Sequence, residues 1–529
     1  MNRFEQEEKI QEGLLPEPPI LFFSNDNSHK KGKSVKPTLI IALLVIFIFI
    51  NCQITPSMKV VQLPVESDST VCFRFWFRAG SQNDPPGKAG LASITSEMLL
   101  HRSIQKSAHN ASLQKYFEDE TNYTVQIDKE MTIFRAQVNT EYSYEFYQLF
   151  KDEILNPTFT EEKLALVKQK VILSLAQALQ ISTDEELCKA TLYQFIFKGT
   201  NYETANAGLV ETLESITLEN VQQFYQTHFT RDNLIVGVGG QYSLNLVRHI
   251  KSDFNNLPSG TNIAPDLPNF NPINGLEIIL IEKNTKFTTI SLGFPLHVLR
   301  GSRDYYALWL ANFWFAQQGG QTGKPNDNLP IRYNSRIEFS PGPQNTWFPH
   351  CNVARRQQIF EMRIQPVPFD RSQFVLRAGL HALKQFVRNG LSQEQFELAR
   401  NLIETNYSEL MFSTNARLGY QLDDIFYGVS TNFLDSFKDE IDKLTLEDVN
   451  QAVKKHLQSE NIKIAIFTED AKSFRQMLMQ NKPGPIESSS SKPANVEKVE
   501  QEIAEFELSV EPENVWIIPG ENMFVSYLK

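Results

Sequence analysis

The chain has 529 residues, of which 41% are hydrophobic and 21% charged, a composition typical of a globular protein with roughly two to four domains. Its net charge is -11 and its sequence pI is about 5.5. Because no basic cluster is long enough to follow a phosphate backbone, nucleic acid is excluded as a partner. The four cysteines stand far apart without a Cys-x-x-Cys pair, which predicts structural thiols rather than a zinc knuckle or a disulfide framework.

The first 54 residues predict a membrane tether. Residues 1–37 are rich in polar residues and proline, and we expect a disordered cytoplasmic tail. Residues 39–50 form an apolar run, and with its flanks the segment 38–54 is barely long enough for a transmembrane anchor, which needs roughly 17 to 25 residues. A lysine cluster precedes the anchor, at Lys30, Lys31, Lys33 and Lys36. It places the bulk of the chain outside the cytoplasm, in the periplasm if the protein is bacterial. The alternative is a lipoprotein signal with Cys52 as the lipid-bearing residue.

The first half, residues 55–254, predicts an α+β unit. Four strands are expected, at residues 71–78, 123–127, 131–138 and 234–238. A turn rich in proline precedes an amphipathic helix at residues 90–101, and helical patterns dominate residues 142–229. This order of elements favours helices on one face of a mostly antiparallel sheet.

The chain then repeats itself. Residues 215–221 resemble residues 443–449, and a histidine and an asparagine follow each copy at the same spacing. The repeat predicts a second homologous half at residues 275–480, joined to the first by a Pro- and Asn-rich linker at 255–274, and we expect the two halves to enclose a cavity. Thr217 and Thr445 are expected to cap the helix that begins each copy.

Three further segments carry smaller predictions. Residues 481–529 begin as a Pro/Ser-rich linker, continue as an amphipathic helix at about 496–506, and end in an apolar stretch that we expect to dock on another part of the molecule. The glycine-rich residues 319–324 are interpreted as a flexible loop, because Pro325 stands where a phosphate loop needs Ser or Thr. Arg355-Arg356 is predicted to be an exposed basic pair.

Residues 57–480 resemble the insulinase family, peptidase family M16, which includes pitrilysin and the mitochondrial processing peptidases. In the first half the resemblance rests on Arg78-Ala79-Gly80-Ser81, on residues 86–92 and on the block 199–229. In the second half it rests on the helix start at Thr445 and on residues 416–428. The order and spacing of these motifs carry the resemblance, which is strongest to bacterial members that have two such halves and no zinc motif.

The resemblance implies that the zinc site has been lost. Active members carry His-x-x-Glu-His in the opening helix, where two histidines hold zinc and the glutamate activates water. Those positions fall on Ser93, Ser96 and Glu97 of this chain, and the third ligand, a glutamate on a later helix, falls on Ser174. Because all four positions are changed, the resemblance implies no bound metal and no activity of this chain on its own. Zinc is expected only in a partner subunit.

Two interpretations of the opening helix remain. Glu97 and His101 stand one turn apart, so both could reach one ion, but a catalytic zinc needs a third protein ligand and none is visible. The favoured interpretation is a structural helix that turns Ile94, Met98 and Leu99 toward the core.

The second half implies one substrate contact. Relatives supply an arginine and, seven residues later, a tyrosine, which donate hydrogen bonds toward the substrate carbonyl. These positions fall on Arg332 and Phe339, and phenylalanine has no hydroxyl to donate. Arg332 is therefore the candidate substrate-binding residue, with an ordinary surface arginine as the alternative. Arg417 and Tyr420 share a helix face and are interpreted as surface and packing residues.

The sequence thus predicts a membrane-tethered, catalytically silent subunit with an insulinase-type fold. It would bind extended peptide and act in proteolysis as a heterodimer with a zinc-bearing peptidase subunit of the same family. One alternative is a peptide-binding or scaffold protein without a proteolytic partner. The other is a metalloendopeptidase with an unorthodox metal site.

Overall fold

The structure is a computed structural model that describes residues 58–100, 111, 115, 123–181, 183–260, 267–318, 333–337, 356–410, 413–429, 432–482 and 494–522. The predicted cytoplasmic tail and anchor, residues 1–37 and 38–54, lie outside these ranges, as do Cys52 and residues 319–324. None of the helices within the described ranges combines the length and the apolar character that a membrane span requires.

The first half is built on a five-stranded sheet in the order β1-β5-β2-β4-β3. Its strands are β1 (Val60–Pro64), β2 (Thr70–Phe77), β3 (Tyr123–Ile127), β4 (Thr132–Asn139) and β5 (Leu234–Gly240). β1 pairs with β5 in parallel, and the other three pairs of neighbours are antiparallel. The mostly antiparallel sheet and the four strands expected from the sequence are confirmed, and β1 is an additional strand that the sequence pattern did not reveal.

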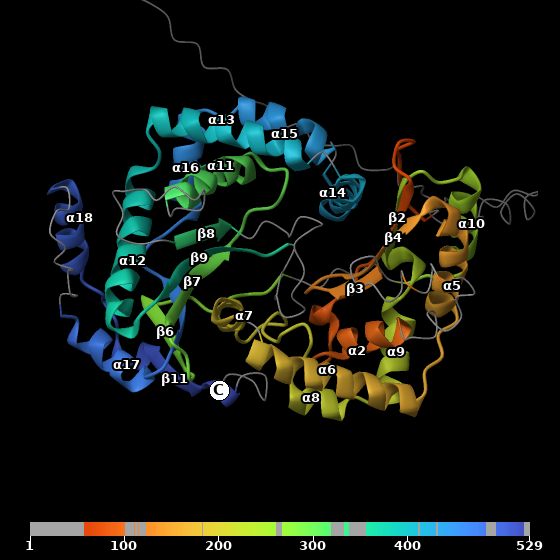
Figure 1. The fold of residues 1–529 in the computed structure, drawn as a ribbon, viewed down its shortest axis with the longest axis horizontal. Coiled ribbons are helices and arrows are strands. Elements are labelled where there is room, and N and C mark those ends of the chain that lie inside the picture. The colour runs from red at the N-terminus through yellow and green to blue at the C-terminus, as the bar shows by residue number, and fades with distance from the viewer. Residues whose placement is uncertain are drawn as a thin grey trace, which may run out of the picture. The chain divides into compact units, whose positions relative to one another are not determined.

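Helices cover one face of this sheet through aromatic packing (Figure 1). The helices of the first half are α2 (Leu91–Leu99), α5 (Ser143–Leu155), α6 (Glu161–Ile181), α7 (Asp184–Ile196), α8 (Val210–Ser215), α9 (Leu218–His228) and α10 (Leu244–Phe254). Three phenylalanines at alternate positions of β2 meet rings from these helices. The ring-centroid distances are 5.3 Å for Phe73–Phe146, 4.7 Å for Phe75–Phe150, 4.9 Å for Phe75–Phe254 and 4.7 Å for Phe77–Phe229.

The second half repeats the topology of the first. Its strands are β6 (Leu276–Glu282), β7 (Thr288–Leu296), β8 (Tyr333–Ile337), β9 (Gln358–Val367), β10 (Ile462–Thr468) and β11 (Val515–Pro519). The sheet order is β11-β6-β10-β7-β9-β8, so that β6-β10-β7-β9-β8 reproduces β1-β5-β2-β4-β3. The two homologous halves predicted from the repeat are confirmed as two copies of one strand arrangement, and β11 is an addition to the second copy.

Helices of the second half surround its sheet in the same manner. They are α11 (Arg303–Gln318), α12 (Ser372–Asn389), α13 (Gln393–Leu410), α14 (Thr414–Tyr427), α15 (Phe433–Asp442), α16 (Leu446–His456), α17 (Ala471–Gln480) and α18 (Ala494–Ala504). The two predicted caps are confirmed: the hydroxyl of Thr217 accepts the N–H of Asn220 at 3.2 Å, and that of Thr445 accepts the N–H of Asp448 at 3.2 Å. Each cap satisfies an amide that has no partner inside its helix.

The halves exchange one helix each, which the sequence did not predict. α7 of the first half packs on β7 and β10 of the second sheet, and α14 of the second half packs on β5 and β1 of the first sheet. Leu418 and Leu422 of α14 belong to one cluster with Trp76 of β2. Gly237 of β5 makes room for this helix, because a Cβ there would lie 2.5 Å from a methyl group of Leu422. Each sheet is therefore covered on both faces, on the second face by a helix of the other half.

Candidate functional site

The opening helix of the predicted site is α2, and a buried carboxylate fixes where it begins. Asp84 accepts the N–H groups of Gly90 and Ala92, each at 2.7 Å. Gly90 has φ +92, in the left-handed region, and a Cβ there would lie 2.7 Å from the carbonyl oxygen of Ala207. Glycine is therefore required at the turn into α2. Ile94, Met98 and Leu99 are 0% exposed, which confirms the predicted core face of this helix.

Serines stand at three of the four positions to which the family resemblance assigns the zinc ligands and the water-activating glutamate. Ser93 is 8% and Ser96 0% exposed. Ser96 donates to the carbonyl oxygen of Ala92 at 2.7 Å, and Ser174 donates to that of Val171 at 2.7 Å, so both hydroxyls bond to their own helices. α2 and α6, which carry these positions, pack against each other. The helices expected to hold the ligands are thus brought together, and the hydroxyls of Ser96 and Ser174 bond within their own helices.

The fourth position, Glu97, is paired with a lysine. Its carboxylate lies 2.8 Å from Nζ of Lys170 on α6. An ammonium group therefore neutralises the one carboxylate that remains among the four positions. His101, the other member of the alternative metal pair, lies outside the described residues. Among the residues that the structure describes, no three His, Cys, Asp or Glu side chains are arranged to hold a metal ion.

The predicted substrate contact lies beyond the described part of the second half. Arg332 and Phe339 flank the described segment 333–337, which forms β8 at the edge of the second sheet. Their assignment stays a prediction. Tyr420 on α14 is 6% exposed and stacks on Phe433 with a ring-centroid distance of 5.8 Å, which confirms its interpretation as a packing residue.

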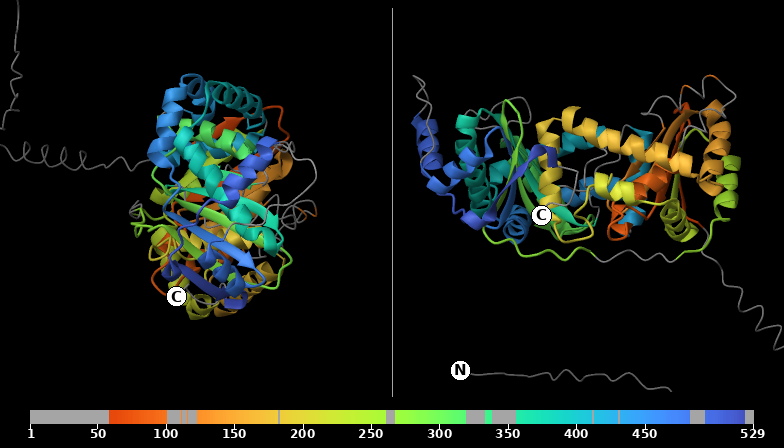
Figure 2. Two further views of the ribbon diagram at one scale, coloured as in Figure 1. Left: turned by 90° about the vertical axis from the view of Figure 1, so that its left-hand side faces the viewer. Right: turned by 90° about the horizontal axis from the view of Figure 1, so that it is seen from below.

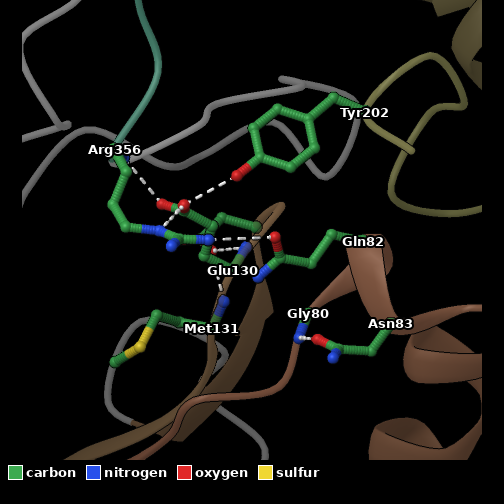
Figure 3. A network of polar contacts seen from close by, with 8 residues as sticks. Gly80, Gln82, Asn83, Glu130, Met131, Tyr202 and Arg356 are labelled. Atoms are coloured by element: carbon green, nitrogen blue, oxygen red, sulfur yellow. Dashed lines mark hydrogen bonds and ion pairs between the residues drawn. The ribbon is translucent and has the colours of Figure 1, made fainter. Parts of the chain in front are cut away.

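Near α2, the structure brings together a polar cluster that the sequence did not reveal (Figure 3). Glu130, in the turn between β3 and β4, is 1% exposed. Its Oε1 accepts the hydroxyl of Tyr202 at 2.7 Å and Nε of Arg356 at 2.6 Å, and its Oε2 accepts the backbone N–H of Arg356 at 2.8 Å. Gln82 accepts a weaker bond from Arg356 at 3.4 Å. This cluster joins the two halves, because Arg356 belongs to the second half.

The prediction that Arg356 belongs to an exposed basic pair is wrong. Its side chain is only 21% exposed and is bound to the buried Glu130. Glu130 lies 226 residues earlier in the chain, so nothing in the local sequence indicates the pairing. Arg355 lies outside the described residues.

The turn that carries Glu130 is held by buried charges. Asp128, Lys129 and Glu130 are 2%, 0% and 1% exposed. The Nζ of Lys129 donates to the carbonyl oxygen of Thr204, and the carbonyl oxygen of Asp128 accepts the N–H of Ser81 at 3.1 Å. A charged hairpin turn is ordinarily solvated. The sequence therefore did not reveal that these three consecutive charged residues are buried.

Gly80 permits the close approach of the strand end to the buried turn. A Cβ at Gly80 would lie 2.5 Å from the carbonyl oxygen of Asp128. The motif Arg78-Ala79-Gly80-Ser81, which carried the family resemblance, therefore has a physical role: it lets the strand end lie against the buried turn.

Asp84 and Lys129 are two buried groups of opposite charge whose pKa values are moved toward neutrality. Burial raises the pKa of Asp84 to about 7, although the amide hydrogen bonds at the start of α2 and the Lys129 ammonium lower it. Burial lowers the pKa of Lys129 to about 7, although Asp84, Asp128 and Glu203 raise it. The two groups change protonation in the same pH range.

This pair predicts a pH dependence of stability. The folded chain holds a proton on Asp84 more tightly than the unfolded chain, so this contribution to stability falls as the pH rises from about 4 to about 7. The contribution of Lys129 falls as the pH drops from about 10 to about 7. We expect Asp84→Asn, which keeps one acceptor for α2, to reduce the change in the free energy of unfolding between pH 5 and pH 7. Denaturant unfolding at pH 5, 7 and 9 measures it.

The exposed Asp442 provides the control for this measurement. Asp442→Asn is expected to leave the slope between pH 5 and pH 7 unchanged, because Asp442 lies in an exposed ion pair with Lys438. If Asp84→Asn also leaves that slope unchanged, Asp84 does not carry it.

The fold and the site define a class of protein: two copies of one α+β unit, with serines and a lysine-paired glutamate at the positions that the resemblance assigns to the metal chemistry. Residues 59–208 match the family model described as "Insulinase (Peptidase family M16)", and residues 215–403 match the one described as "Peptidase M16 inactive domain". The chain belongs to the M16 family. This confirms the family resemblance noted in the sequence and the two-half α+β fold class.

The chain is similar to proteins from several bacteria. The "Non-peptidase homolog YmxG" of Helicobacter pylori is 21% identical over 397 residues, which are 75% of this chain and 88% of the relative. The "Uncharacterized zinc protease YmxG" of Bacillus subtilis is 19% identical over 418 residues, 78% of this chain and 94% of the relative. A crystal structure of a peptidase M16 inactive domain from Pseudomonas fluorescens superposes with a TM-score of 0.63 at 18% identity, covering 78% of this chain and 96% of that one.

Proposed function

We propose that this chain is a non-catalytic M16 subunit, tethered to a membrane by residues 38–54, that binds extended peptide for a zinc-bearing partner of the same family. The observation that carries the proposal is the chemistry of the contact between α2 and α6. There Ser96 and Ser174 bond to their own helices, and Glu97 is neutralised by Lys170. A catalytic zinc needs three protein ligands and an open position, and the four family positions do not supply them.

The sheet edges support the peptide-binding part of the proposal. In the described part of the chain, β3 pairs only with β4, and β8 pairs only with β9, so each half ends in an edge strand at the same place in its sheet. An extended peptide can add to such an edge through main-chain hydrogen bonds, which tolerate many side chains. Arg332 comes directly before β8 in the sequence.

The relatives' names differ on catalysis and leave the partner open. One relative is named a non-peptidase homologue and another a zinc protease. The division of labour that we propose requires both kinds of chain: this one supplies the binding surface and Arg332, and the partner supplies histidine, glutamate and metal. The heterodimer, the membrane anchor and the extracytoplasmic location all belong to this proposal.

The decisive experiment is co-purification from native membranes, followed by metal analysis and peptide cleavage. We expect the isolated chain to hold far less than one zinc per chain and to cleave no peptide. Adding it to the zinc-bearing M16 subunit that co-purifies should raise the cleavage rate. Arg332→Ala should then lower the kcat of the complex on the order of 100-fold, the effect of removing one donor to a developing oxyanion.

Arg248→Ala provides the matched control, because Arg248 is an exposed arginine of α10 whose guanidinium contacts Asn245 on the same helix. We expect it to leave cleavage unchanged. Stoichiometric zinc in the isolated chain would overturn the proposal in favour of an unorthodox metallopeptidase. Peptide binding without any effect on a co-purified peptidase would favour the scaffold alternative.

A further inference from the structure

The strand next to the end of the second sheet, β6, is apolar on both faces. Ile278 and Leu280 of β6 lie in the core beneath the helices of the second half, whereas Ile279 and Ile281 lie in the core that includes α7. An apolar strand with an open edge presents a row of unpaired N–H and C=O groups to any other strand. β11 covers this edge in parallel, from Val515 opposite Ile278 to Pro519 opposite Glu282.

The corresponding edge strand of the first sheet is built differently. β1 has the sequence Val-Val-Gln-Leu-Pro, in which Gln62 and Pro64 are exposed. Proline has no N–H to donate, and a polar residue on a short edge strand disfavours further pairing. No further strand pairs with β1 in the part of the chain that the structure describes. The first sheet therefore carries protection within its own edge strand, and the second sheet receives it from elsewhere in the chain.

A helix and a buried arginine hold the covering segment in place. α18 lies along α12 (Figures 1 and 2). Arg377 of α12 is 1% exposed and donates to the carbonyl oxygens of Ala504 at 2.6 Å and Lys482 at 2.7 Å. Ile503 is 1% and Leu508 3% exposed, so the segment after α18 is also packed against the second half.

The strand itself is held more lightly than the helix. Trp516 is 39% and Ile517 37% exposed, and Val515 is the buried residue of β11. The ring of Trp516 lies 5.5 Å from that of Phe195 on α7, and Asn514 donates to the carbonyl oxygen of Asn274 at 3.1 Å. Side-chain burial on β11 is thus small, and the main-chain pairing with β6 is its principal attachment.

We propose that residues 494–519, which we call the C-terminal cap, prevent β6 from pairing with β6 of a second copy of this chain. Two copies related by a twofold axis would bring their β6 edges together in antiparallel orientation, and each edge offers seven residues, of which the five other than Glu277 and Glu282 are apolar. With the cap in place, the main-chain N–H and C=O groups at the edge of β6 are paired within one chain. That the chain is thereby kept for an unlike partner rests on the proposed function; the capping itself does not.

The test breaks the strand pairing in the full chain while leaving α18 intact. Alternate residues of a strand direct their N–H groups to the same neighbour, so either Ile517 or the pair Trp516 and Ile518 donates to β6. We therefore expect either Ile517→Pro or the double variant Trp516→Pro/Ile518→Pro to self-associate in detergent at about tenfold lower concentration than the natural chain. Sedimentation equilibrium measures this, and hydrogen exchange reports the protection of the β6 amides.

A synthetic peptide of residues 494–522 distinguishes an open edge from misfolding. Added in excess, it is expected to occupy β6 and return the proline variant to the monomer, while near-ultraviolet circular dichroism shows the fold unchanged. Glu513→Ala, at an exposed position just before β11, is the control and should behave as the natural chain. The proposal is overturned if both proline variants stay monomeric, or if their association is not reversed by the peptide.

Discussion

Arg300→Ala is expected to lower the free energy of unfolding by about 3 to 5 kcal/mol, because it removes the guanidinium that neutralises a buried carboxylate. Arg300 lies 3.0 Å from Asp423, and the two side chains are 2% and 1% exposed. The guanidinium also lies over the rings of Tyr420, Tyr427 and Phe433, at 5.3, 5.0 and 4.9 Å. Denaturant unfolding of the purified chain measures the loss.

This variant also tests the helix exchange between the halves. Asp423 and the two tyrosines belong to α14, which covers the second face of the first sheet. Loss of Arg300 should therefore loosen α14 and raise its hydrogen exchange, in addition to lowering global stability. Arg303→Ala is the control, since Arg303 is 51% exposed in its pair with Asp448 and is expected to contribute less than about 1 kcal/mol. Equal losses of unfolding free energy in Arg300→Ala and Arg303→Ala would contradict the expectation that the buried pair contributes more to stability than the exposed one.

Arg356→Ala is expected to lower the free energy of unfolding by about 3 kcal/mol, the low end for breaking a buried pair, because Arg356 is itself partly exposed. The reason is Glu130, which is 1% exposed and would keep the Tyr202 hydroxyl but lose the guanidinium. Arg356→Lys keeps the charge and should lose less. The same denaturant measurement applies.

A double variant separates the charge from the packing. Glu130→Gln combined with Arg356→Ala leaves no uncompensated charge at position 130, so we expect it to be more stable than Arg356→Ala alone. If Arg356→Ala and the double variant lower the free energy of unfolding equally, the Glu130–Arg356 contact does not stabilise the junction between the halves. Lys438→Ala, in an exposed helical pair with Asp442, is the control and should change stability by less than about 1 kcal/mol.

Features encoded by local pattern were predictable from the sequence. The alternating aromatic residues of β2 predicted a strand, and in the structure their rings pack on one layer of helices. The repeated helix start gave Thr217 and Thr445 as caps, and both accept the amide three residues later. Such features depend on neighbours within a turn or a strand, and for that reason they can be predicted without knowledge of the fold.

Features that depend on distant partners were not predictable. Arg356 and Glu130 are separated by 226 residues, and Arg74 reaches the side chain of Asn415 across 341 residues. An arginine in a loop is most often solvated, so the sequence alone favours exposure unless a buried carboxylate is known to face it. The burial of Lys129 escaped prediction for the same reason.

The sequence by itself determined the two halves, because a repeat is a property of the chain. Through the family resemblance it also assigned the three ligand positions to Ser93, Glu97 and Ser174 and the catalytic glutamate to Ser96, an assignment that stays a prediction. Only the tertiary structure decided that α7 and α14 are exchanged between the sheets, that β11 covers β6, and that Glu97 is paired with Lys170. These outcomes follow from which surfaces meet when the chain folds, and contacts between residues far apart in sequence leave no periodic signal.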